Sequence, residues 1–136
     1  MATAGYSGTP LPKKLGIKEA TLFATVHAPD DFVSTLGALP LEAEWRTRLS
    51  RGLDVVIAFY TSRAALVKDW PKLTEAAAPD GTVWVAWPKK ASKVATDITE
   101  DVVRELLLPS GWVDNKVCAI DDTWSGLRFA LRRELR

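Results

Sequence analysis

The chain has 136 residues, of which 47% are hydrophobic and 26% charged, and its formal net charge at pH 7 is +1. This length and composition indicate one globular domain and exclude a disordered or membrane-embedded chain. A net charge so close to zero argues against a protein dedicated to nucleic acids or membrane surfaces. One histidine and one cysteine are too few for a structural zinc site, and we predict neither a metal nor a cofactor.

The sequence also bears on cellular location. A single cysteine excludes an internal disulfide, which agrees with a reducing cytoplasm. The first residues contain no hydrophobic block behind basic residues, so no signal peptide is expected. The longest apolar run, Leu53 to Tyr60, is interrupted by Asp54 and is too short to cross a bilayer. We therefore expect a cytoplasmic protein without a membrane-spanning segment.

The chain is predicted to divide into an N-terminal arm and one domain. Residues 1–18 are small, polar and proline-containing, and they predict an extended arm with a short turn through residues 13–16. Tyr6 and Leu11 are apolar anchors within this arm. Residues 19–136 predict a single α/β domain, because strand-like and helix-like patterns alternate along them.

Hydrophobic period and turn residues predict the elements of that domain. In chain order these are strand Thr21–Val26, helix Asp31–Leu36, a weak strand Glu42–Leu49, strand Leu53–Tyr60, a helix capped by Ser62, strand Thr82–Trp87, helix Ile98–Leu108, and the strands Trp112–Ile120 and Thr123–Arg132. Thr21–Val26, Leu53–Tyr60 and Thr82–Trp87 are expected at the centre of the sheet, because these runs are apolar on both faces.

Caps and breakers predict the element boundaries. Asp30 is expected to cap the helix after the first strand, and Gly37 to end it. Pro71 should kink or split the following helix after Trp70. Residues 78–81, Ala-Pro-Asp-Gly, predict a turn, and residues 97–100, Asp-Ile-Thr-Glu, predict a helix start like a capping box.

These elements predict a three-layer, Rossmann-like α/β fold with a mostly parallel sheet and a C-terminal antiparallel β-hairpin. Their order resembles the second half of the class I methyltransferase fold. Four motifs, at residues 6–11 (YSGTPL), 14–18 (KLGIK), 87–92 (WPKKAS) and 122–127 (DTWSGL), resemble a family of small bacterial, largely actinobacterial, proteins known as a domain of unknown function. The resemblance covers nearly the whole chain. It implies this fold and a bacterial cytoplasmic setting, and it supplies no catalytic residues.

A ligand site is predicted at the carboxyl edge of the sheet, where ligands gather in parallel α/β folds. Loops 27–31, 61–63, 88–92 and 121–125 should meet there if the strand Trp112–Ile120 runs parallel to the central strands. The candidate ligand-binding residues are His27, Ser62, Arg63, Lys89, Lys90, Ser92, Asp122 and Trp124. The lysines would supply charge, the serines hydroxyl groups and Trp124 a stacking face, so the partner would be an anionic small molecule or a protein.

The lysine loop is the centre of this hypothesis. Pro88 fixes the backbone, and because neighbouring residues of an extended segment point to opposite sides, only Lys89 or Lys90 can face the crevice. That lysine and Trp124 would define the ligand edge, with the N-terminal arm folded over it. The C-terminal arginines do not favour nucleic-acid binding, since no aromatic residues are interleaved with them.

The alternative is an enzyme: a divergent transferase, either methyltransferase-like or with His27 as general base beside Asp30 or Asp31. A nucleotide-binding first strand is usually followed by a glycine-rich turn, but residues 27–31 read His-Ala-Pro-Asp-Asp. We therefore expect that S-adenosylmethionine does not bind, and prefer a non-catalytic domain. Cys118 lies in a predicted apolar strand, so we expect its thiol to be buried and unreactive.

Overall fold

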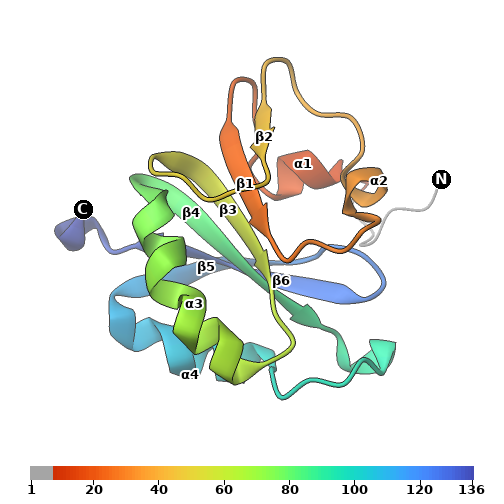
Figure 1. Cartoon of the computed structure of the whole chain (residues 1–136), viewed down its shortest axis with the longest axis vertical. Helices are drawn as coiled ribbons and strands as arrows, with labels where there is room; N and C mark the ends of the chain where they lie inside the picture. Colours follow the sequence, from red (N-terminus) through yellow and green to blue (C-terminus); the bar gives the residue numbers. More distant parts are fainter. Residues whose placement is uncertain (1–7) are drawn as a thin grey trace.

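A computed structural model describes residues 8–136 of the chain (Figure 1). The strands are β1 Leu22–Val26, β2 Glu44–Arg46, β3 Leu53–Phe59, β4 Ala77–Pro88, β5 Trp112–Ala119 and β6 Trp124–Leu131. The helices are α1 Leu11–Lys14, α2 Phe32–Leu36, α3 Arg63–Ala76 and α4 Glu100–Leu107, and short 3₁₀ turns are η1 Lys90–Ser92, η2 Leu108–Ser110 and η3 Arg133–Leu135.

The strands of the described residues form one sheet in the order β2-β1-β3-β4-β6-β5. The pairs β1–β2, β1–β3 and β3–β4 are parallel, and β6 is antiparallel to both β4 and β5. The predicted mostly parallel sheet with an antiparallel C-terminal hairpin is therefore confirmed. So is the central place of β3, whose residues are all buried except Asp54. The weak strand predicted over residues 42–49 is only the three-residue edge strand β2.

Two apolar clusters lie on the two faces of the sheet. On one face, α3 and α4 bury Leu66, Leu73 and Val103 against the strands. On the other face, α1 and α2 bury Leu15 and Phe32 (Figure 1). Both helices on this second face are short, with four and five residues, so a large part of its cover comes from loops and from residues 15–17.

The N-terminal arm differs from the extended segment that the sequence predicts. Residues 11–14 form α1, and the residues after it enter the core: Leu15 and Ile17 are 0% and 1% exposed. The indole Nε1 of the fully buried Trp84 donates to the Leu15 carbonyl at 2.9 Å. Burial of this apolar pair and the hydrogen bond to Trp84 fix the segment against the sheet. The predicted anchor Tyr6 lies outside the described residues.

The predicted helix caps need correction. Asp31, not Asp30, precedes α2, and its side chain makes no capping hydrogen bond. Thr99 caps α4 by accepting from the backbone N–H of Val102 at 3.2 Å. Asp97 instead accepts from the backbone N–H of Arg63 at 2.8 Å, because the first turn of α3 lies next to it and has unpaired donors. Gly37, with φ of 75°, ends α2 as predicted.

Two predicted breaks lie inside regular elements. Of the kink or split predicted at Pro71, the split does not occur, since α3 continues from Arg63 to Ala76. Trp70 and Leu73 are buried on either side of Pro71, and their packing offsets the lost backbone hydrogen bond. Residues 78–81, predicted as a turn, form an irregularity within β4. Ala77 pairs with Leu53 and Thr82 with Val55, so these four residues lie opposite Asp54 alone.

Candidate functional site

The carboxyl edge of the sheet collects the loops that the sequence predicts there. Because β5 is antiparallel to β6, and β6 to β4, β5 runs parallel to the central strands. The ends of β1, β3, β4 and β5 therefore share one edge. The candidate residues in these loops have different environments, and they do not form a single cluster.

The hydroxyl groups of the two candidate serines form hydrogen bonds with nearby backbone groups. The Ser62 hydroxyl accepts from the backbone N–H of Ala65 at 3.3 Å and caps α3. The Ser92 hydroxyl donates to the Lys89 carbonyl at 2.6 Å and accepts from the N–H of Val94 at 3.3 Å. Both hydroxyl groups are thus engaged in local structure, which is the ordinary role of serine in caps and turns.

Trp124 lies in a packed environment. Its ring is half-buried and meets Phe59 edge to face, with the centroids 5.1 Å apart. The turn before it is shaped by Asp121, whose Oδ1 accepts from the backbone N–H groups of Thr123 and Trp124, both at 2.8 Å. The candidate Asp122 is exposed beside this turn, as Arg63 is at the start of α3.

Lys89 and Lys90 differ in exposure. Lys89 is half-buried, and its backbone N–H donates to the Thr123 carbonyl at 2.7 Å, which ties the end of β4 to the β5–β6 turn. Lys90 is exposed. Pro88 pairs with Trp124 across the sheet, so Lys89 and Trp124 do lie at the same corner.

A basic hollow lies at the end of β5. It measures about 460 Å³ and is lined by Thr9, Lys13, Lys14, Lys116, Val117, Cys118 and Ala119. None of these described lining residues is acidic. The Lys14 ammonium donates to the Ala119 carbonyl at 3.4 Å, which joins α1 to the edge strand.

The thiol of Cys118 reports the electrostatics of this hollow. Its pKa is raised because burial disfavours the thiolate; the positive charges of Lys14, Lys116, Arg128 and Lys89 act in the opposite direction and do not overcome burial. All four charged groups that act on the thiol are therefore cations. Lys116 pairs with Arg128, and Cys118 lies two residues further along the strand, so the three share the sheet face that α1 covers.

A second cluster surrounds His27, at the end of β1. Its Nε2 lies 3.6 Å from Oδ2 of Asp69 on α3, and its ring meets Tyr60 edge to face at 5.4 Å. The Tyr60 hydroxyl donates to the same Asp69 oxygen at 2.7 Å, while the Lys72 ammonium lies 3.4 Å from Oδ1. The partner predicted for His27, Asp30 or Asp31, is wrong, because α3 brings Asp69 to the imidazole instead.

The charge states of Asp69 and Tyr60 follow from their surroundings. Burial alone would raise the pKa of Asp69, but the hydrogen bond from Tyr60 and the nearby Lys72 and His27 hold it below its usual value. Burial, and next the hydrogen bond to Asp69, raise the pKa of Tyr60 far above its usual range. At neutral pH Asp69 is thus a carboxylate and Tyr60 a neutral donor.

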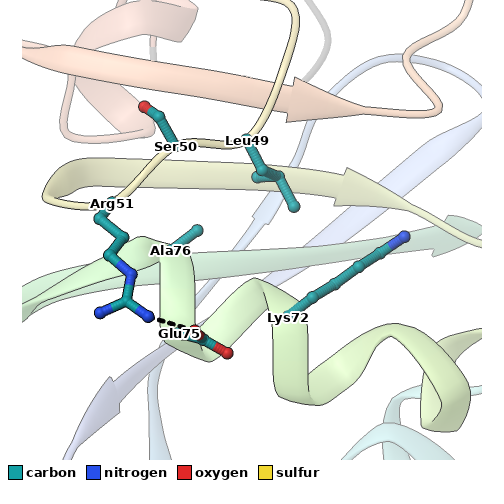
Figure 2. A pocket seen from close by; sticks show the side chains of 6 residues that line it. All are labelled: Leu49, Ser50, Arg51, Lys72, Glu75 and Ala76. Atoms are coloured by element: carbon teal, nitrogen blue, oxygen red, sulfur yellow. Dashed lines mark hydrogen bonds and ion pairs between the residues drawn. The ribbon is translucent and has the colours of Figure 1, made fainter.

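A second hollow, of about 270 Å³, separates α3 from the chain that crosses from β2 to β3 (Figure 2). At its mouth Arg51 Nη2 lies 2.7 Å from Glu75 Oε1. Figure 2 shows Lys72 extending away from this pair, in agreement with its contact to Asp69. Each cation here has an acidic partner, Glu75 for Arg51 and Asp69 for Lys72, so neither is left without a nearby negative charge.

Within residues 8–136, no group of three or more His, Cys, Asp or Glu side chains is placed to hold a metal ion. Over the same residues, no helix has the length and apolarity needed to cross a membrane.

No family model matches this chain, and no curated protein matches it. Several solved structures do match it in fold. A SAM-dependent methyltransferase from Aquifex aeolicus has 13% identity and a TM-score of 0.61, over 86% of this chain and 85% of that one. The N-methyltransferase NodS from Bradyrhizobium japonicum WM9, in complex with S-adenosyl-L-homocysteine, has 11% identity and a TM-score of 0.57, over 90% and 84%. The DhpI–SAH complex has 13% identity and a TM-score of 0.57, over 91% and 83%.

At these identities the likeness concerns the fold. The chain therefore has a methyltransferase-like α/β fold, built on a mixed six-stranded sheet with an antiparallel hairpin. This agrees with the fold that the order of elements resembles. The likeness of the four sequence motifs to a bacterial family stays a prediction.

Proposed function

We propose that the basic hollow at the end of β5 is a non-catalytic site that binds a small anionic, phosphate-bearing molecule. One observation carries the proposal: three lysines line the hollow, Lys89 and Arg128 add their charges to it, and no described lining residue is acidic. The overall composition does not produce this excess, since the net charge of the whole chain is only +1.

Charge and size both favour such a ligand. Cations that share a hollow repel one another, and a bound anion would replace this repulsion with attraction. A volume of about 460 Å³ falls within the usual range for small-molecule sites. The two walls are already held in place, because Lys14 contacts the end of β5 and Trp84 holds Leu15. The site would then need little rearrangement on binding.

The proposed anion site lies beside α1 and the end of β5, whereas the sequence predicted it at the lysine loop, residues 88–92. Lys89 is retained, because its charge acts on Cys118 inside the hollow. The lining residues come from α1, from Thr9 ahead of it and from β5, and do not include the other candidates. Lysines at positions 13, 14 and 116 are the ones that sequence reasoning missed.

Titration calorimetry with pyrophosphate, ATP and adenosine tests the proposal. We expect the two phosphates to bind and uncharged adenosine not to bind. Lys13→Gln and Lys116→Gln should each weaken binding about tenfold, the effect of losing one hydrogen bond to a charged group. Lys68→Gln, which removes an exposed lysine from α3, is the matched control and should change nothing.

Alkylation of the single cysteine by neutral iodoacetamide gives a second readout. A ligand in the hollow should slow the modification of Cys118, which lines it. Binding that is equally sensitive to Lys68→Gln and Lys116→Gln, and that leaves alkylation unchanged, would refute this location of the site.

The alternative is an enzyme of the transferase type, as two of the structural neighbours are methyltransferases. Residues at the expected nucleotide position do not fit S-adenosylmethionine. The turn after β1 has no glycine, and Pro29 lacks a backbone donor. Strand β2 ends at Arg46, which pairs with Glu44 at 2.8 Å, where an acidic residue would be needed to hold a ribose. We therefore propose that this nucleotide site has been lost.

A further inference from the structure

We propose a second, independent site at the end of β1, in which His27, positioned by Asp69 and Tyr60, accepts a proton from a ligand that carries a hydroxyl, thiol or amine group. The inference goes beyond anion binding at the basic hollow and does not depend on it.

The geometry assigns different roles to the two imidazole nitrogens. Nε2 faces the Asp69 carboxylate at 3.6 Å, so in the neutral ring the hydrogen belongs on Nε2. The lone pair is then on Nδ1. The side chain is 61% exposed, so the ring is accessible to a ligand. A histidine that served only to tie the loop to α3 would need no such exposure.

The carboxylate that orients the ring is itself held firmly. The Asp69 side chain is only 13% exposed and accepts from the Tyr60 hydroxyl at 2.7 Å. Tyr60 is in turn fixed to β4, because its backbone N–H donates to the Ala86 carbonyl at 2.9 Å. Lys72 occupies the other carboxylate oxygen, which leaves Oδ2 to Tyr60 and His27. These contacts favour one orientation of the imidazole.

The backbone at this position is unusual. His27 has φ of 57°, in the left-handed region, which costs a non-glycine residue on the order of 1 kcal/mol. Such a conformation persists when the surroundings hold it, and here Tyr60 and Asp69 hold the ring. Strained residues of this kind cluster at functional sites, and this one stands at the sheet edge where ligands of α/β proteins bind.

The site is separate from the basic hollow. Four strand spacings lie between β1 and β5, which amounts to about 19 Å. A small molecule bound in one site would not reach the other. A substitution that abolishes one site should therefore leave the other intact.

The proposed proton transfer needs no reactant other than the ligand and His27. The O–H, S–H or N–H bond of the ligand breaks, and the proton moves to Nδ1. The electron pair stays on the ligand atom, which becomes more nucleophilic. The imidazolium that forms is stabilised by the Asp69 carboxylate, which keeps its negative charge.

Modification by diethyl pyrocarbonate tests the proposal on the full-length protein. His27 is the only histidine, so the signal of carbethoxyhistidine reports this residue alone. Proton–nitrogen correlation spectra of ¹⁵N-labelled protein give both the tautomer and the nitrogen that is modified. We expect the Nε2–H tautomer, modification at Nδ1, and a rate about fivefold higher than in Asp69→Asn, the factor for one partly exposed ion pair.

The control is Asp101→Asn, which neutralises an aspartate that is 99% exposed on α4 and should leave the rate unchanged. Modification at Nε2, or a rate that Asp69→Asn does not alter, would overturn the proposal. Should Asp69→Asn fail to fold, the tautomer and the modified nitrogen in the unaltered protein still decide, since a merely structural histidine has no reason to present Nδ1.

Discussion

Replacing Tyr60 by phenylalanine measures how strongly the histidine cluster is held together. The ring stays, but Asp69 loses its shortest hydrogen bond, the one of 2.7 Å from the tyrosine hydroxyl. A hydrogen bond to a charged group contributes about 1.5–3 kcal/mol, and Tyr60 is only 3% exposed, so solvent does not replace it. We expect the free energy of unfolding at pH 7 to fall by that amount, and the melting temperature by about 5–10 °C.

The pH dependence gives this prediction its specificity. Folding lowers the pKa of Asp69 from its ordinary 3.8, so its contribution is complete above that value and is lost as the pH falls toward the folded pKa. Folding raises the pKa of Tyr60 from its ordinary 10.0, so its contribution is complete below that value and is lost as the pH rises. The difference between the two proteins should therefore be largest between about pH 4 and 10 and shrink outside this range.

Urea denaturation of both proteins between pH 3 and 11, followed by the fluorescence of the six tryptophans, provides the measurement. Asp69→Asn and the double variant complete a thermodynamic cycle, in which the two changes should not be additive. A loss of stability that is the same at every pH would show that the hydroxyl acts by packing and not through the carboxylate. The charges assigned to the cluster would then be wrong.

The remaining predictions concern the frame and the two sites. Gly81→Ala should cost about 1–3 kcal/mol in urea denaturation, because its Cβ would lie 2.7 Å from the Leu53 carbonyl oxygen; a loss below about 0.5 kcal/mol would contradict the close approach. Trp84→Phe should cost about 1–3 kcal/mol, since the buried Leu15 carbonyl loses its donor, and hydrogen exchange should rise over residues 11–17 and not over α4. S-adenosylmethionine should produce no binding heat in calorimetry, and micromolar affinity would favour the enzyme alternative. Cys118 should react with iodoacetamide more slowly than free N-acetylcysteine at pH 8, because burial raises its pKa; an equal rate would mean that the thiol is more open than the structure shows.

The central strands were predictable because their signal is local. A run such as Leu53 to Tyr60 is apolar on both faces, and only the middle of a parallel sheet buries both faces. The hairpin and the loops at the carboxyl edge follow from chain order and connection rules. Local signals were less dependable where packing outweighs them, as at Pro71, which α3 accommodates, and at residues 78–81, which β4 absorbs.

The sites depended on contacts between distant residues. His27 follows β1, Tyr60 follows β3 and Asp69 lies on α3. The available sequence signal for this cluster was a polar residue, Tyr60, at the end of a buried strand. The direction in which α3 packs chose Asp69 over Asp30 and Asp31 as the partner of the imidazole.

By itself, the sequence determined the α/β class, the central strands and the edge at which polar loops gather, because these depend on hydrophobic period and turn chemistry within short segments. Tertiary structure alone decided that α1 lies against the end of β5, which brings Lys13 and Lys14 to Lys116 across a hundred residues. Electrostatic interactions act through space, so no local pattern marks such a site until the chain is folded.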